Sequence, residues 1–368
     1  MRAPVVAWIG FSGDFRSGRR ACSPDFRAFP RARWLEALRA AAETAPFDQL
    51  GYSEEGGESR LRTVLADHLN RKRGAAAAPG TICVFPGAGP AMTQLSQALA
   101  ADGHTQIGVE DPGSSRLWQA ARSAGLELVP LPVDDDGLVV DELSTHPRLR
   151  AWPSLLSWAR RAGGLIVEDD YDSEFSYDGS ALPTMQGADP GRVALLGSMS
   201  RTLTPTINVG WVVAPRRLVP LVRAAAPLPP GPPAMTQLAL AHLMESGAYD
   251  RHLRTSRQRF RARRNALITA LQRHLLECRV SGAHAGLHLV LDLPAGSDRA
   301  VILAAAEQRD MRLCNIDDTR FQPDPQELRL QVGYGNLADT LVDEAVTVLA
   351  DVIRHAGARP PRRTTTAR

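Results

Sequence analysis

Short apolar segments alternate with helical segments between residues 61 and 215. The apolar positions of 61–73 recur every three or four residues, which predicts a helix that stops at Gly74. Helical patterns also cover 86–100, 114–125 and 154–163. Apolar runs of strand length lie at 81–85, 106–110, 126–133, 165–170, 193–198 and 209–215. Strands that alternate with helices predict an α/β fold with a mostly parallel sheet.

The pattern changes after the proline-rich stretch 228–233. One long helix is predicted over 237–275, with its many arginines on a solvated face. Strands over 286–293 and 327–335 and a helix over 341–353 then predict a smaller α+β domain. His288 lies in the first of these alternating strands, and we interpret it as a packed core or dimer-interface residue. The predicted domains are 1–45 (an N-terminal arm and part of the small domain), 46–233 (large), 234–356 (small) and 357–368 (a disordered basic tail).

Composition limits the function classes. A chain of 368 residues suggests one large and one smaller domain, and 44% hydrophobic residues are enough for a substantial core. The net charge of +3 gives no strong basic field, so we expect no nucleic-acid partner. We expect no membrane partner and a cytoplasmic location, because no apolar run reaches spanning length and no signal peptide is visible. The four cysteines form no CxxC pair, so we expect no metal site.

Seven blocks follow one another along the chain: FRAFPRARW (26–34), LGYSEEGGESRLRTVLADHL (50–69), VEDPG (109–113), VEDDYDSEFSYDG (167–179), GSMSRTLTP (197–205), AGLHLVLDL (285–293) and VGYGNL (332–337). In this order they resemble the fold-type I pyridoxal-phosphate (PLP)-dependent aminotransferases, and above all the aminotransferase domain of MocR/GabR-type regulators. The resemblance implies a large PLP-type domain, a small domain built from both chain ends, and a homodimer with Tyr52 near the partner's cleft. The chain begins directly at this domain, so we expect no winged-helix DNA-binding domain.

Arg201 stands where the resemblance places the catalytic lysine. That lysine forms a Schiff base and shuttles a proton, and both tasks need an amine that can lose its proton. An arginine, with a pKa of about 12.5–13.8, stays protonated. The only lysine of the sequence, Lys72, lies at the polar end of a predicted helix and is not expected to replace it.

The predicted phosphate-binding loop is also altered. The resemblance implies a hydroxyl and an amide side chain in this loop, but here it consists of Gly87, Ala88 and Gly89. Backbone N–H groups at a helix N-terminus can still hold an anion, and Ser198 and Ser200 keep hydroxyl groups nearby. A generic glycine turn is an equally good interpretation of the loop.

Three further positions depart from the resemblance. Asn208 stands where a phosphate-binding arginine is implied, and Ser114 stands where an aromatic residue is implied. The sequence runs from VVDELSTHPRLR (139–150) almost directly into AWPSLLSWARRAGG (151–164), so we expect that a PSHQFPTG-like motif implied by the resemblance is deleted there. Whether a sheet strand is lost with this motif stays open. Because these features are lost together with the lysine, we expect a degenerate PLP site and no cofactor.

Asp169 and Tyr171 remain where the resemblance implies contacts to the ring nitrogen and ring oxygen of PLP. Asp169 ends a predicted strand, which is the edge where open α/β sheets bind ligands. Together with Arg201, these residues are the predicted catalytic set. Two other interpretations stay open: Arg201 could form only a salt bridge to Asp169, or Asp169 and Tyr171 could be inherited without a present role.

The predicted substrate-binding residues are Arg329, Gln331, His146, Asn208 and Ser114. Arg329 and Gln331 are two residues apart and share a strand face, near the block where the resemblance implies an arginine for the substrate carboxylate. An arginine that faces solvent and a surface histidine are the competing interpretations for Arg329 and His146.

Three functions are compatible with this pattern. The favoured one is a PLP-independent enzyme that acts on a small amino- or carboxylate-bearing metabolite in the vacated cleft. The first alternative is a non-catalytic ligand-binding or scaffolding homodimer. The second is an aminotransferase-like protein that holds PLP non-covalently. Fold alone does not decide between them.

Overall fold

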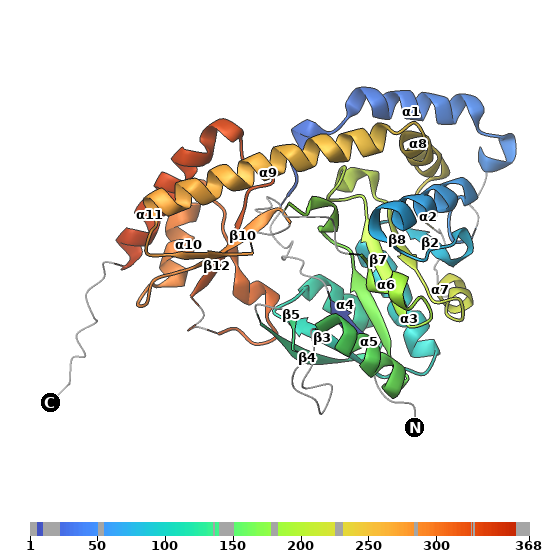
Figure 1. Cartoon of the computed structure of the whole chain (residues 1–368), viewed down its shortest axis with the longest axis horizontal. Helices are drawn as coiled ribbons and strands as arrows, with labels where there is room; N and C mark the ends of the chain where they lie inside the picture. The colour runs from blue at the N-terminus through green and yellow to red at the C-terminus, as the bar shows by residue number, and fades with distance from the viewer. Residues whose placement is uncertain are drawn as a thin grey trace.

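The computed structural model consists of a large α/β unit and a smaller α+β unit, joined by one long helix (Figure 1). Among the described residues, the large unit contains an eight-stranded sheet and the small unit a four-stranded sheet. This architecture confirms the predicted α/β fold of the fold-type I aminotransferases. The structure describes residues 6–9, 23–50, 55–134, 137–139, 151–177, 183–224, 231–282, 286–324, 326 and 328–357.

The large sheet is mostly parallel. β8 runs antiparallel to both of its neighbours, and β5 forms an antiparallel hairpin with β4, but the strands from β7 to β4 are parallel to one another. The strands lie across the sheet in the order β2 (Ile82–Phe85), β8 (Gly210–Val213), β7 (Val193–Ser198), β6 (Leu165–Asp169), β1 (Val6–Ile9), β3 (Gln106–Asp111), β4 (Glu127–Asp134) and β5 (Gly137–Leu138).

Helices cover both faces of the large sheet, which explains why its strands are continuous apolar runs. Three helices pack against the face that carries Ile107 and Val109: α3 (Ala88–Ala101), α4 (Ser115–Ser123) and α7 (Val219–Ala224). The other face is covered by α1 (Arg31–Thr44), α2 (Ser59–Arg73), α5 (Ala151–Ala162), α6 (Met185–Ala188) and α8 (Ala234–Glu245). The stop predicted at Gly74 is confirmed, since this residue ends α2 in the left-handed conformation.

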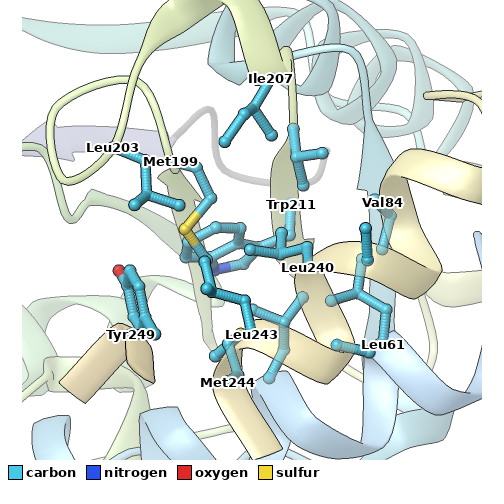
Figure 2. Close-up of a cluster of buried hydrophobic side chains, with 14 of the residues drawn as sticks. Leu61, Val84, Met199, Leu203, Ile207, Trp211, Leu240, Leu243, Met244 and Tyr249 are labelled. Atoms are coloured by element: carbon cyan, nitrogen blue, oxygen red, sulfur yellow. The ribbon is translucent and has the colours of Figure 1, made fainter. Parts of the chain in front are cut away.

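The indole of Trp211 lies at the centre of the core beneath α2 and α8, with Met199, Leu61 and Leu240 around it (Figure 2). A Cβ atom on Gly197 would lie 2.6 Å from the indole ring. The neighbouring strand therefore needs glycine at this position. This core supports the loop that follows β7, because Met199 belongs to both.

Residues 6–9 differ from the arm or small-domain segment predicted for residues 1–45. They form β1, which pairs in parallel with β6 on one side and with β3 on the other. The sequence leaves open whether a strand is lost between 143 and 154, and the large sheet has no gap between β3 and β6 because β1 fills that place.

The small unit is an antiparallel sheet covered by helices on one face. Leu289, Leu291 and Leu330 point into its core, and α10 (Arg299–Glu307) and α11 (Val342–Gly357) cover them. The strand order is β11 (Cys314–Asn315), β12 (Arg329–Gly333), β10 (His288–Asp292) and β9 (Arg279–Ser281).

The single helix predicted over 237–275 is broken into α8 and α9 (Ala248–His274). Gly247 allows the break because it adopts a φ of 68°, a conformation that favours glycine. α8 packs in the core of the large unit, so the domain boundary predicted at residue 234 differs from the packing. α9 passes from the large-unit core at Leu253 to the small-unit core at Phe260.

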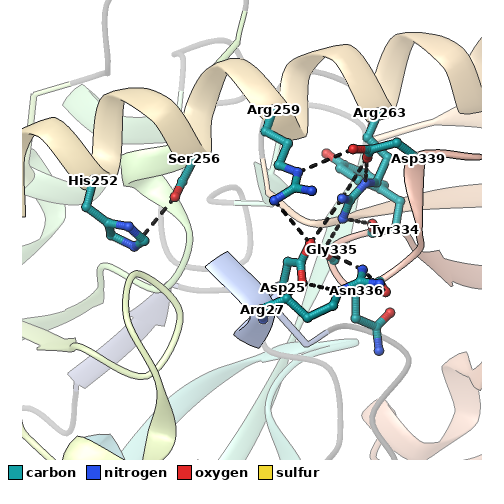
Figure 3. Close-up of polar contacts among 10 residues, drawn as sticks. All are labelled: Asp25, Arg27, His252, Ser256, Arg259, Arg263, Tyr334, Gly335, Asn336 and Asp339. Atoms are coloured by element: carbon teal, nitrogen blue, oxygen red, sulfur yellow. Dashed lines mark hydrogen bonds and ion pairs between the residues drawn. The ribbon is translucent and has the colours of Figure 1, made fainter. Parts of the chain in front are cut away.

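Not all arginines of α9 face solvent as predicted. The side chain of Arg263 is fully buried, and it donates hydrogen bonds to Asp25, to Asp339 and to the carbonyl oxygens of Tyr334 and Gly335 (Figure 3). This cluster ties the segment before α1 to the small unit. It is therefore consistent with the expectation that both ends of the chain contribute to this unit.

We expect Asp25→Ala to lower the free energy of unfolding by about 3 kcal/mol, because it leaves the buried Arg263 guanidinium without one of its two carboxylate partners. The matched control is Arg273→Ala, which removes an exposed ion pair with Asp343 and should cost less than about 1 kcal/mol. Urea denaturation measures both. Equal losses in the two variants would contradict this role for Asp25.

Candidate functional site

The candidate site lies where parallel strands of the large sheet end. Asp169 is the last residue of β6, and Ser198 is the last residue of the neighbouring β7. The N–H of Asp170 donates to the carbonyl oxygen of Leu196, so the two strand ends stay in register. Ligands of open α/β sheets bind outside this edge.

The structure brings the three predicted catalytic residues together. Arg201 is 4% exposed, and its guanidinium carbon lies 4.2 Å from the centroid of the Tyr171 ring. Burial raises the pKa of Asp169 well above its usual range, the charges of Asp170, Asp172 and Glu110 raise it further, and the charge of Arg201 opposes them. Arg201 is thus stacked on one of its predicted partners and is electrostatically coupled to the other.

The loop after β7 holds Arg201 through the residue that follows it. Tyr249 Oη donates to Thr202 Oγ1 at 3.0 Å, and His252 Nε2 lies 2.8 Å from the Thr202 carbonyl oxygen. Burial lowers the pKa of His252, which keeps its ring neutral and able to donate to this oxygen. The first turns of α9 therefore fix the backbone beside Arg201.

Several buried polar atoms near this edge have no hydrogen-bond partner among the described residues. They include Asp169 Oδ2, Tyr171 Oη and Asp172 Oδ1. Burial raises the pKa of Asp172 to about 7, although an N–H group of Leu287 favours its charged form. A buried polar group without a partner costs about 1–3 kcal/mol. Such groups are able to form hydrogen bonds to a ligand or to water at this edge.

His288 belongs to this site, although the sequence interpretation placed it in the core or at a dimer interface. Its neighbours Leu287 and Leu289 point into the core of the small unit, so strand alternation turns His288 to the opposite face. Burial and the charge of Arg201 lower the pKa of His288 to about 4, and the ring is neutral at physiological pH. The alternation of apolar and polar residues along this strand is the sequence signal that indicates on which face His288 lies.

Gln331 lies on the same face of the small sheet as His288. Gln331 pairs with Val290, and His288 pairs with Gly333 on the same two strands. Gln331 is 1% exposed, and neither its amide nitrogen nor its amide oxygen has a hydrogen-bond partner among the described residues. Arg329 begins the same strand opposite Asp292 and is only half-buried.

The predicted anion-binding loop forms the N-terminus of α3. Gly87 has a φ of 92°, and Ala88 and Gly89 are the first residues of the helix. The Asn208 side-chain oxygen lies 3.4 Å from the place that a Cβ of Gly87 would take. The guanidinium of Arg116, a residue that the sequence interpretation did not select, lies 2.9 Å from the corresponding place on Gly89.

The other predicted site residues lie near the Arg201 cluster or near the loop at Gly87, or they are not among the described residues. Ser198 pairs with Gly210, whose Cα touches the Gly87 backbone so closely that no Cβ fits. Ser200 follows β7 and is half-buried, and Ser114 is 3% exposed just before α4. His146 and Tyr52 lie outside the described residues.

The small unit closes over the end of β3. The N–H of Gly113 donates to the Thr319 carbonyl oxygen at 2.7 Å, and the N–H of Phe321 donates to the Asp111 carboxylate at 3.0 Å. The Phe321 ring lies 4.9 Å from the ring of Trp118. These contacts hold the two units together on the Glu110 side of the site.

The residues of the site do not fit PLP bound as a Schiff base. That linkage needs an amine that can lose its proton, and Arg201 does not supply one. The only lysine of the sequence, Lys72, lies at the end of α2, with Nζ 3.7 Å from a carboxylate oxygen of Asp250. Asn208 adds no positive charge beside Gly87. Within the described ranges, no group of three or more His, Cys, Asp or Glu side chains is arranged to hold a metal ion.

This fold, with a ligand-binding edge between a large parallel sheet and a small antiparallel one, defines an aminotransferase-like protein. The family model for aminotransferases of class I and II matches residues 143–349, and the chain belongs to this family. The probable rhizopine catabolism regulatory protein MocR of Rhizobium meliloti is 30% identical over 94% of this chain and 74% of its own length. The resemblance to MocR-type regulators is confirmed.

Other comparisons agree on the fold. The pyridoxine biosynthesis transcriptional regulator PdxR of Corynebacterium glutamicum is 32% identical over 77% of this chain and 65% of its own length. The solved multiple substrate aminotransferase of Thermococcus profundus superposes with a TM-score of 0.81 at 20% identity, covering 96% of this chain and 92% of that one.

In the described part of the chain, no helix has the length and apolarity to cross a bilayer.

We expect stability to depend on pH through Glu168, which is 7% exposed and accepts the N–H groups of Met185 and Gln186. Burial raises its pKa from 4.5 to about 7. The folded protein therefore binds more protons than the unfolded chain between these values, and stability falls as pH rises through this window. The loss attributable to this group is at most about 3 kcal/mol.

Glu168→Gln removes the titration and keeps the side-chain shape. Unfolding free energies measured at pH 5 and pH 8 should differ less in this variant than in the wild type. The comparison isolates Glu168, because other buried carboxyls such as Asp172 titrate in both proteins. Equal pH dependence in the two proteins would show that Glu168 is already charged in the fold at low pH.

Proposed function

We propose that this chain is an enzyme that uses no Schiff-base PLP chemistry and acts directly on a small amino- or carboxylate-bearing metabolite. One observation carries the proposal: Arg201 is buried on the Tyr171 ring beside Asp169, at the strand edge where ligands bind. A permanent cation in this place excludes an internal aldimine and offers a partner for a carboxylate instead.

The polar atoms of the site suit a ligand that carries both signs of charge. Asp169 Oδ2 accepts hydrogen bonds and has no described partner, which suits an ammonium group. The Tyr171 hydroxyl donates a hydrogen bond, and the Arg201 guanidinium can bind a carboxylate through two parallel bonds. An α-amino acid or a closely related zwitterion satisfies all three residues.

Proton transfer is the chemistry that these residues support. A carboxyl whose pKa is raised by burial, such as that of Asp169, holds its proton more readily than an exposed carboxyl and can act as a general acid or base. The ring of His288 stays neutral and can form a hydrogen bond to the ligand from the small-unit side. Arg201 and Tyr171 would then hold the ligand, and Asp169 would exchange the proton with it.

A second candidate function is non-catalytic binding of the same class of ligand. The relatives MocR and PdxR are named as regulatory proteins, which favours a sensing role. Both candidates use the same site and differ only in turnover. The homodimer implied by the resemblance belongs to both proposals.

We expect the purified protein to be colourless and to gain no imine absorbance when PLP is added. Borohydride treatment should attach no pyridoxyl group to any cleft residue, because Arg201 forms no reducible imine. Absorbance spectra and peptide mass mapping measure the two results. A pyridoxyl group on the exposed Lys72 alone would mark surface labelling, whereas an imine band that borohydride bleaches, with label in the cleft, would refute the proposal.

We expect Arg201→Ala to abolish the rise in melting temperature that the best ligand in a panel of amino acids and their 2-oxo acids produces. Arg257→Ala is the matched control, since it removes a guanidinium bound to Glu174 and leaves ligand stabilisation unchanged. If Arg201 only neutralises Asp169, the variant should lose about 3–5 kcal/mol of stability and keep any ligand response.

Arg201→Lys should remain inactive in transamination. The change restores an amine, but Asn208 and Ala88 still stand where the resemblance implies the phosphate-binding arginine and the loop hydroxyl group. Amino-group transfer from common amino acids to 2-oxo acids, with added PLP, measures this activity. Appreciable turnover would show that the cofactor site is nearly complete.

A further inference from the structure

The centre of the large sheet depends on the first described strand of the chain. β6 and β3 do not pair with each other; β1 lies between them and runs parallel to both. Ala7 is in register with Ile166 on one side and with Gly108 on the other. Without β1 the sheet would fall into two halves, one that ends at β6 and one that begins at β3.

Neither of these strands could end the sheet at this place. Ile166 and Val167 of β6 are 0% exposed, and Ile107 and Val109 of β3 are at most 1% exposed. Helices pack on both faces of these strands, so backbone N–H and C=O groups left unpaired between them would be buried without hydrogen-bond partners. The space between β3 and β6 therefore fits one parallel strand and requires it.

The chain between β5 and β6 supplies no described strand for this place. After β5 the next described element is α5, which leads directly into β6. The strand and the PSHQFPTG-like motif expected from the resemblance are missing from the same part of the sequence. The residues that follow β1 read FSGDFRSG (11–18) and share Ser12, Phe15 and Gly18 with that motif at the same spacing.

We propose that residues 6–9 are a transposed strand, which comes from the beginning of the same chain and replaces the missing internal strand between β3 and β6. β1 thereby holds two walls of the site apart, because β6 carries Asp169 and β3 carries Glu110 and Asp111 at their carboxyl ends. Two strand spacings of about 4.8 Å each separate these walls. This inference does not depend on the proposed function.

The first test places proline in the strand of the full chain. Ala7→Pro removes a ladder N–H in the centre of the sheet, whereas Ala3→Pro, outside β1, is the matched control. In hydrogen exchange followed by mass spectrometry, the amides of residues 6–9 should be as protected in the wild type as those of β3 and β6. Ala7→Pro should speed exchange in 106–111 and 165–169 by at least about tenfold and leave 288–292 unchanged.

Exchange of residues 6–9 at the rate of a free peptide in the wild type would overturn the proposal. Identical exchange of β3 and β6 in the two proline variants would also overturn it. If Ala7→Pro does not fold while Ala3→Pro does, the need for this strand is shown by that difference. If neither variant folds, hydrogen exchange of residues 6–9 in the wild type decides the test.

The second test shows which chain supplies the strand. Ala7 and Gly108 are direct partners, and adjacent strands lie about 4.8 Å apart, within the range that a disulfide spans. Oxidation of an Ala7→Cys/Gly108→Cys double variant should give a cross-linked product of monomer mass, identified by peptide mapping. Ala7→Cys with Ala91→Cys on α3 is the control and should not cross-link. A 7–108 link of dimer mass, or no more cross-linking than in the control, would overturn the assignment.

Discussion

A permanent positive charge is buried at the carboxyl edge of the large sheet, and the neighbouring groups balance it. Arg201 cannot lose its proton, so its burial requires an aromatic face, a counter-charge or both. Tyr171 provides the face at 4.2 Å, and the charge of Arg201 opposes the rise that burial causes in the pKa of Asp169. Burial, together with the positive charge of Arg201, lowers the pKa of His288 to about 4, so its ring stays neutral. Burial and the charge of Arg201 therefore act together on the pKa values of the residues around it.

The scaffold fixes this charge from two directions. Thr202, the next residue along the chain, is held by the side chains of Tyr249 and His252 from the first turns of α9. The same helix continues into the small unit, where Arg263 binds the segment before α1. The helix thus connects the Arg201 loop with the core of the small unit and with the segment before α1.

The sequence predicted elements whose apolar pattern lies within the element itself. It did not predict features that depend on residues far away along the chain. Strands such as β6 were visible because helices cover both faces and make the whole run apolar. β1 was missed because a four-residue apolar strand gives no signal of partners far along the chain. The burial of Arg263 depends on Asp25, which no periodicity within α9 reveals. The grouping of Arg201 with Asp169 and Tyr171 was predictable from the resemblance, but the direction of His288 required attention to strand alternation.

The balance of charge at this edge limits the kind of ligand that it can hold. Asp170 is already paired with Arg73 at 2.9 Å, whereas the acidic groups of Asp172 and Glu110 both raise the pKa of Asp169. A ligand that carries only negative charge, such as a phosphate monoester, would meet these carboxyl groups as well as Arg201. A ligand with an ammonium group and a carboxylate separates the two interactions, one to the acidic side and one to the guanidinium. The electrostatics of the described residues around Asp169 and Arg201 thus favour a zwitterion over a ligand that carries only negative charge.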